Sequence, residues 1–168
     1  MLSSKLKHIK LILASASPRR QDFFKSLALD YEIRLKPVDE IYPPHLTHSE
    51  ISDYLAQLKA QPFLNELKTN ELLITSDTIV WHNNIALGKP KNKEEAIEMI
   101  SVLSNSSHDV ITSMCFTQTT KQIVVHDVTK VTFKALTKDE IHYYVDTFLP
   151  LDKAGAYGIQ EWIGAIGV

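Results

Sequence analysis

The sequence has one cysteine and only five glycines among its 168 residues. A single cysteine cannot form an intramolecular disulfide, so a disulfide-stabilised framework is excluded. The apolar neighbours of Cys115 in ITSMCF predict a buried thiol. The few glycines argue against a flexible multi-domain array. We therefore expect one domain, which at this length is large enough to bury a substantial core.

Long apolar runs and an excess of positive charge are also lacking. The basic start, MLSSKLKHIK, is followed by only three apolar residues, 11–13, which is too short for the core of a signal peptide. No stretch approaches the roughly eighteen apolar residues of a membrane span, so we expect a soluble cytoplasmic protein. The net charge of −2 and the pI near 6.4 argue against sequence-independent nucleic-acid binding. Any phosphate-bearing partner must therefore bind at a local cluster of positive charge, and we expect such a partner to be small.

Residues 9–24, IKLILASASPRRQDFF, contain an apolar run, a turn of small residues and the start of a helix. The nearly continuous apolar run 9–13 predicts a buried strand. Ser17 is placed as the helix N-cap and Pro18 at the first helical position, where its missing N–H costs nothing. The apolar residues of this helix, expected over residues 18–28 and buried at helical spacing, are Phe23, Phe24 and Leu27.

Arg19 and Arg20 follow in the first turn of that helix. The N-terminal end of a helix carries partial positive charge, so two cations there are unfavourable by a few tenths of a kcal/mol each. A negative partner should therefore lie nearby. Free N–H groups, the Ser15 hydroxyl and two guanidiniums suit a phosphate. The alternative is a solvated helix start with both arginines facing water.

Charged residues that could act with this site follow in the next segment. Residues 30–36 alternate apolar and charged side chains, which predicts a half-buried strand, and Asp39 and Glu40 come shortly after it. These two carboxylates can hold a divalent cation or simply be solvated. Residues 47–50 form a capping box that opens a helix, and Lys59 lies at the edge of its apolar stripe. Lys59 either has a functional role or only extends its charge to water.

Asp77 is the strongest catalytic candidate. It interrupts an apolar stretch, residues 72–81, and a buried carboxylate is costly unless it is paired, hydrogen-bonded or bound to metal. The alternative is an aspartate that closes a turn with its own backbone. Residues 82–84, His-Asn-Asn, predict a tight hairpin turn. Lys89 follows in Gly-Lys-Pro, which is not a P-loop, although the lysine could reach a phosphate as a point charge.

The second half of the chain is expected to hold helices and antiparallel strands. Asn92 caps a helix, residues 108–136 are rich in β-branched side chains, and residues 137–140 form a second capping box. His108 and His126 are single histidines without a close ligand partner, which argues against a zinc site.

Residues 150–160, PLDKAGAYGIQ, form the last informative segment. Gly155 and Gly158 let the backbone approach another surface closely, and Gln160 offers both a donor and an acceptor. The adjacent Asp and Lys at positions 152 and 153 predict a surface ion pair of little energetic value.

Taken together these segments resemble one known family. The motifs that carry the resemblance run in order from residue 11 to about residue 160: LILASASPRR, Asp39-Glu40, Lys59-Ala60 in LAQLKA, Ser76-Asp77-Thr78, Gly88-Lys89-Pro90, AIEMISVLS and PLDKAGAYGIQ. They are similar to those of the Maf family, the septum-formation-type nucleotide pyrophosphatases.

The resemblance implies an α/β fold like that of the inosine-triphosphate pyrophosphatases. This is an elongated, twisted mixed sheet flanked by helices, with two lobes and a central cleft, here as a single Maf-like domain over residues 1–168. It also implies splitting of nucleoside triphosphates into monophosphate and pyrophosphate with a divalent metal cation such as Mg²⁺ or Mn²⁺. The Asp-Thr pair and the DKAGAYGIQ ending resemble the branch that acts on dTTP, UTP and related, including modified, nucleotides. A homodimer and a house-cleaning role are implied as well.

The resemblance further implies roles for individual residues. Carried over position by position, the phosphate-binding residues are Ser15, Arg19 and Arg20, with cationic contacts from Lys59 and Lys89. Glu40 and Asp77 bind the metal, and Asp77 also acts as the base for the attacking water. Gln160 completes the substrate-binding site. The reaction itself requires groups of these kinds. Attack of water on a triphosphate needs cations that neutralise the phosphate charge and a carboxylate that orients the water.

One departure from the family pattern concerns the end of the chain. Family members continue past the GIQ segment, whereas this sequence ends at Val168. We therefore expect a terminal strand and helix to be missing. The alternative function is a catalytically weak nucleotide-binding regulator of cell division or septum formation.

Overall fold

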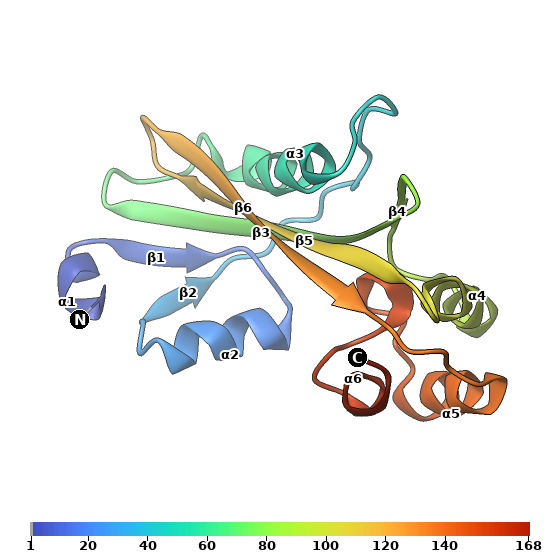
Figure 1. Cartoon of the computed structure of the whole chain (residues 1–168). Coiled ribbons are helices and arrows are strands. Elements are labelled where there is room, and N and C mark those ends of the chain that lie inside the picture. Colours follow the sequence, from blue (N-terminus) through green and yellow to red (C-terminus); the bar gives the residue numbers. More distant parts are fainter. Residues whose placement is uncertain (1) are drawn as a thin grey trace. The chain divides into compact units, whose positions relative to one another are not determined.

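The computed structural model describes residues 2–168. Helices and strands alternate through most of the chain (Figure 1). In order, the elements are α1 (Leu2–Leu6), β1 (Lys10–Leu13), α2 (Pro18–Ser26), β2 (Tyr31–Ile33), α3 (Ser49–Ala60), η1 (Gln61–Phe63), β3 (Glu71–His82), β4 (Ile85–Leu87), α4 (Lys93–Leu103), β5 (Ser107–Thr117), β6 (Gln122–Thr132), α5 (Lys138–Phe148), η2 (Ala154–Ala156) and α6 (Trp162–Gly167). None of the helices described is both long enough and apolar enough to cross a membrane.

The strands form one six-stranded mixed sheet. Its order is β2-β1-β3-β5-β6, and β4 pairs with β3 outside this path. Strand β1 is parallel to both of its neighbours, so that Leu11 is aligned with Tyr31 on β2 and with Leu72 on β3. Strand β4 is antiparallel to β3. The predicted mixed sheet with flanking helices is confirmed.

The chain divides into two compact units. The first unit comprises the described residues up to Asp77 together with Thr112–His126, and the second comprises Thr78–Ile111 and Asp127–Val168. Strands β3, β5 and β6 therefore contribute residues to both units.

In the first unit, helices α2 and α3 lie on opposite faces of the sheet (Figure 1). Side chains on a strand alternate between its two faces, and β1 shows this clearly. Ile12 packs in a cluster with Ala56 and Ala60 of α3, whereas Leu11 and Leu13 pack with Phe24 of α2. Both faces of β1 are thus buried, as its continuous apolar run predicts. The predicted burial of Cys115 is also confirmed.

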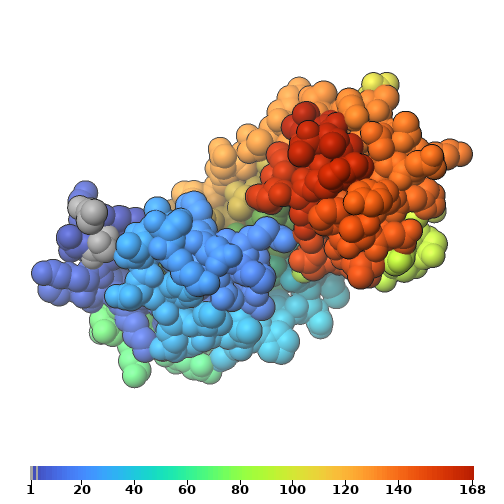
Figure 2. Space-filling model, turned by 90° about the horizontal axis from the view of Figure 1, so that it is seen from below, coloured from blue at the N-terminus to red at the C-terminus, as the bar shows by residue number. Residues whose placement is uncertain are grey.

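Two expectations for this unit were wrong. Helix α2 buries Phe24, but Phe23 is 59% and Leu27 is 41% exposed, because only one narrow face of this short helix meets the sheet. Figure 2 shows α2, in blue, at the surface of the first unit. The predicted strand over residues 30–36 is shorter, since β2 is an edge strand whose last partner is the final residue of β1, Leu13 opposite Ile33. Leu35, beyond it, is 58% exposed.

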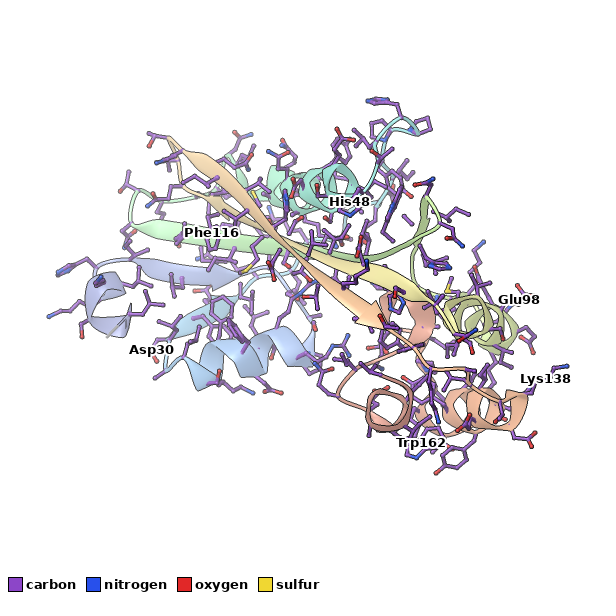
Figure 3. All side chains as sticks on the ribbon, in the orientation of Figure 1. Asp30, His48, Glu98, Phe116, Lys138 and Trp162 are labelled. Atoms are coloured by element: carbon purple, nitrogen blue, oxygen red, sulfur yellow. The ribbon has the colours of Figure 1, made fainter. Side chains whose placement is uncertain are left out.

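The helix starts follow from local hydrogen bonds. At α5, Thr137 and Glu140 form the complete predicted capping box. At α4, the Asn92 Oδ1 accepts from the backbone N–H of Glu95 at 2.8 Å. At α3, the Glu50 carboxylate accepts from the Thr47 N–H at 2.9 Å, while His48 occupies the N-cap position (labelled in Figure 3).

The second unit has its own core. Val80 of β3, Ile100 of α4 and Tyr144 of α5 belong to one buried cluster, which also includes Ile163 of α6. The predicted hairpin between β3 and β4 is confirmed, with positive φ at both Asn83 and Asn84. Asparagine tolerates this left-handed conformation better than most residues, which explains why two of them form the turn.

Candidate functional site

The turn between β1 and α2 is built as the sequence predicted. Pro18 is the first residue of α2 and Ser17 is its N-cap. The Ser17 hydroxyl makes no cap hydrogen bond; instead, the Ser15 Oγ accepts from the Ser17 N–H at 3.2 Å. Ser15 is buried, being 6% exposed. The first N–H groups of a helix have no partner within the helix, so this turn presents hydrogen-bond donors of the kind that bind anions.

Arg20 points from the first turn of α2 toward β3. Its Nη1 donates to the backbone carbonyl of Ser76 at 2.9 Å, which places the guanidinium beside Asp77. Burial lowers the pKa of Arg20, and the negative charges of Asp77 and Glu40 oppose this shift. Arg19, by contrast, is exposed. The two arginines therefore have different surroundings, and the reading in which both face water does not hold for Arg20.

Asp77 lies inside the uninterrupted strand β3, so it does not close a turn. It is 5% exposed, and its Oδ1 accepts from the Lys59 ammonium at 2.5 Å. The same ammonium lies 3.1 Å from the Glu40 Oε1. Lys59 comes from the last turn of α3 and Glu40 from the segment after β2. Three residues that are far apart in the sequence thus meet around one cation.

The electrostatics of this cluster follow from burial. Removal from water raises the pKa of the Asp77 carboxyl, and the Lys59 ammonium opposes that shift. Glu40 raises the pKa of Asp77 further, because two like charges face the same cation. A carboxylate with a raised pKa is a stronger base than an exposed aspartate, which suits a group that must take a proton from water.

The donor set fits a hard divalent cation. Glu40 and Asp77 direct carboxylate oxygens at one point, which Lys59 now occupies. Across residues 2–168 there is no group of three or more His, Cys, Asp or Glu side chains arranged to hold a metal. Mg²⁺ is commonly bound by only one or two carboxylates, with water and substrate phosphates completing its shell. The site therefore fits Mg²⁺ or Mn²⁺, with water molecules, or substrate phosphates when present, as the remaining ligands.

The other two predicted site residues belong to the second unit. Lys89 follows β4, Gln160 follows η2, and both side chains are exposed. The structure thus brings Arg20, Lys59, Glu40 and Asp77 together within the first unit. Among the described residues, Lys89 and Gln160 have no hydrogen bond or ion pair that would assign them a role.

Lys153 is not the surface residue that the sequence suggested. It is only 9% exposed, and its Nζ lies 2.7 Å from Asp152 Oδ1 and 3.1 Å from Glu161 Oε1. Glu161 also accepts a hydrogen bond from the Tyr144 hydroxyl, which in turn accepts from the Gly158 N–H at 3.0 Å. This network holds the segment that carries Gln160, and it packs tightly on Gly158, where a Cβ would lie 3.0 Å from the Glu161 side chain and 3.1 Å from the Lys153 side chain.

Two further sets of interactions in the first unit were missed by sequence reasoning. Arg34 makes two hydrogen bonds to Glu71, of 2.6 and 3.2 Å, and the Glu71 side chain is 1% exposed. Lys36 donates to the Pro62 carbonyl at 2.8 Å and to Glu66 at 2.6 Å. The only local signal was the regular charge alternation of residues 30–36, which predicts the strand but not the partners.

Comparison with known proteins places the chain in a family. Residues 10–168 match the model described as Maf-like protein. A protein of Flavobacterium johnsoniae named dTTP/UTP pyrophosphatase is 62% identical over 168 residues, covering all of this chain and 87% of that protein. A Bacteroides fragilis protein of the same name is 49% identical over 164 residues, covering 97% of this chain and 85% of that protein.

Among solved structures, the Staphylococcus aureus Ham1 protein superposes with a TM-score of 0.52 at 17% identity, covering 74% of this chain and 71% of that one. This likeness concerns the fold alone, and it agrees with the fold expected from the sequence. The match over residues 10–168 and the 62% identity over the whole chain lead to one conclusion. The chain belongs to the Maf family.

Proposed function

We propose that this protein hydrolyses pyrimidine nucleoside triphosphates, dTTP and UTP with their modified relatives, to the monophosphate and pyrophosphate. The observation that carries the proposal is the meeting of Arg20, Lys59, Glu40 and Asp77 in the first unit of a Maf chain. The substrate class is supported by the name of relatives that are up to 62% identical over the whole chain.

The cationic and hydroxyl groups would bind the phosphates. Ser15 and the start of α2 offer hydrogen-bond donors, and Arg19 and Arg20 offer guanidiniums that can each grip two phosphate oxygens. The Lys59 ammonium now balances the carboxylate charge of Asp77. Once the metal takes over that place, the ammonium would be available to the phosphates. Together these groups would neutralise the charge that grows on the phosphate oxygens during water attack.

Asp77 would orient the attacking water and accept its proton as the α–β phosphoanhydride bond breaks. Its position in a strand fixes the carboxylate, and its raised pKa strengthens it as a base. Glu40 and Asp77 would hold the divalent cation, which when bound supplies Lewis-acid stabilisation of phosphate charge. From the second unit, Lys89 would contribute a further cationic contact and Gln160 a hydrogen bond to the nucleotide.

The direct test incubates purified protein with dTTP, UTP and 7-methyl-GTP in the presence of Mg²⁺ or Mn²⁺ and follows pyrophosphate. We expect product from dTTP and UTP. Asp77→Asn should lower kcat by about 10²- to 10⁴-fold, the usual contribution of a general base. Asp146→Asn is the matched control, because Asp146 is exposed and pairs with Lys93 on the surface of the second unit.

Pyrophosphate from none of the three nucleotides would refute the proposal. If dTTP then still protected the protein against thermal unfolding, and did so equally in Asp77→Asn, the nucleotide-binding regulator would be supported instead.

We further propose that the protein acts in the cytoplasm, where its nucleotide substrates are found, and that it forms a homodimer. The dimer is supported by Ile123 and Val125 on the edge strand β6, which are 43% and 49% exposed in the first unit. Unpaired strand edges with exposed apolar side chains favour association. Light scattering on the eluting protein gives its mass, and a mass of 19.0 kDa would refute the dimer.

A further inference from the structure

Glu40 lies in a segment without regular structure. Strand β2 ends at Ile33 and the next helix begins at Ser49. The Arg34 N–H donates to the Leu13 carbonyl at 3.3 Å, and the Ile41 N–H donates to the Asp39 carbonyl at 2.8 Å. The first bond ties the start of the segment to the sheet, but the second is internal to a local turn. Something else must hold this stretch if Glu40 is to face Asp77 at a fixed distance.

Lys36 supplies such an anchor. Its Nζ donates to the Pro62 carbonyl at 2.8 Å and to the Glu66 carboxylate at 2.6 Å, and it lies 5.1 Å from the centre of the Phe63 ring. Phe63 is 2% exposed and belongs to the core cluster beneath α3. A lysine that meets a backbone carbonyl, a carboxylate and a buried aromatic face has a well-defined position, unlike a lysine in a lone surface ion pair.

The partners of Lys36 are connected directly to the site. Pro62 and Phe63 belong to η1, which continues α3 without a break, and the last turn of α3 carries Lys59. On the other side, Lys36 precedes Glu40 by four residues, a span of at most about 14 Å even when fully extended. Lys36 therefore joins the segment that carries Glu40 to the helix end that carries Lys59.

We infer that Lys36 is a positioning residue for the two carboxylates that would hold the metal. It sets the place of Glu40 relative to Asp77. The inference rests on the proposed function, in which these two carboxylates hold the divalent cation. Groups that orient metal ligands without touching the metal commonly change metal affinity by about 10-fold to 100-fold when removed. Lys36 acts on Glu40 through the backbone, so the lower end of that range applies.

The test is Lys36→Met, which keeps an unbranched stem over Phe63 and removes the three N–H donors. Mn²⁺ binding to the nucleotide-free protein is measured by electron paramagnetic resonance, and kcat and KM for dTTP are measured over a range of Mn²⁺ concentrations. We expect Mn²⁺ affinity to fall by about tenfold, with the same shift in the Mn²⁺ concentration that half-activates the enzyme. At saturating Mn²⁺, kcat and the KM for dTTP should stay within about twofold of the wild type, since the groups that meet the nucleotide are intact.

Lys93→Met is the matched control. Lys93 makes an ion pair of 2.6 Å with Asp146 that joins α4 to α5, so its removal costs a comparable surface contact. Glu66→Gln is a second variant, which keeps the bond from Lys36 to the Pro62 carbonyl and should shift Mn²⁺ affinity less than Lys36→Met does.

Thermal unfolding separates positioning from stability. If Lys36→Met and Lys93→Met lower the midpoint alike and neither changes Mn²⁺ affinity, Lys36 is only a stabilising contact and the inference is overturned. Wild-type protein that binds no Mn²⁺ would overturn it as well. A wild type that binds Mn²⁺ but releases no pyrophosphate would refute the proposed function alone, because the binding measurement still reports the effect of Lys36.

Discussion

Replacing Lys59 with methionine should make the nucleotide-free protein bind Mn²⁺ more tightly. The Lys59 ammonium lies 2.5 Å from Asp77 and 3.1 Å from Glu40, so it occupies the point at which the two carboxylates would meet a divalent cation. A metal must displace it. Hydrogen bonds to charged groups contribute about 1.5–3 kcal/mol, and the loss of this competition corresponds to a gain of about tenfold to a hundredfold in affinity.

The gain in metal affinity should be accompanied by a loss of catalysis. Once displaced, the Lys59 charge is available to the phosphates, and loss of one such group typically lowers kcat by about 10²- to 10³-fold. Calorimetric titration with Mn²⁺ at mildly alkaline pH measures the first effect and pyrophosphate release the second. The Lys59→Met/Asp77→Asn double variant is the control, and it should lose the added affinity.

Unchanged or weaker Mn²⁺ binding by Lys59→Met would refute the reasoning. It would mean that the metal does not bind between these carboxylates, or that the lysine does not compete for them. A gain in Mn²⁺ affinity without a loss of kcat would show that Lys59 competes with the metal but does not assist the reaction, so that it acts only as a counter-ion to the carboxylates.

Three other predictions concern the stability of each unit. Arg34→Leu should lower the free energy of unfolding in urea by about 1.5–3 kcal/mol, because the buried Glu71 carboxylate loses both hydrogen bonds from Arg34 and keeps only the Lys68 N–H and the Lys10 ammonium, and a loss below about 0.5 kcal/mol would contradict this. His108 is buried and its pKa is lowered to about 4, mainly by burial, so the neutral ring contributes stability that is full above about pH 6.5 and is lost as pH falls toward 4. The shift corresponds to about 3 kcal/mol, and urea titrations of wild type and His108→Gln across that range should show the pH dependence shrinking in the variant. Gly155→Ala should destabilise by at least about 2 kcal/mol, since φ is +66° and the new Cβ would lie 2.7 Å from Val80 Cγ2; Val80→Ala in the same chain should recover only the part due to overlap.

Local patterns predicted the local structure well. The complete capping box at Thr137 and Glu140 depends on residues three apart, and the hairpin at Asn83 and Asn84 depends on two residues that tolerate positive φ. The β1–turn–α2 unit around Pro18 was predicted for the same reason. In each case the interacting groups are near neighbours in the sequence, so the physics that fixes them can be read from a short window.

Pairings across the chain could not be predicted in this way. Asp77 was recognised as a costly buried carboxylate, but only the structure shows that Lys59 is its partner. Lys153 resembles any lysine in a polar loop, and its burial comes from Glu161 and from the packing of η2, which no short window contains. The opposite error occurred at Phe23 and Leu27, which were predicted to be buried and are exposed. Helical spacing predicts an apolar face but does not say how much of that face the sheet covers.

The bond from Arg20 to the backbone carbonyl of Ser76 has an evolutionary consequence. Every amino acid provides that carbonyl, so position 76 can change among small side chains while Arg20 keeps its anchor. Lys59 and Asp77 instead meet through their side chains, and a change at either position alone removes the nearest counter-charge from the other. Across related sequences, positions 59 and 77 should therefore be constrained as a pair, whereas substitutions at position 76 should occur independently of position 20.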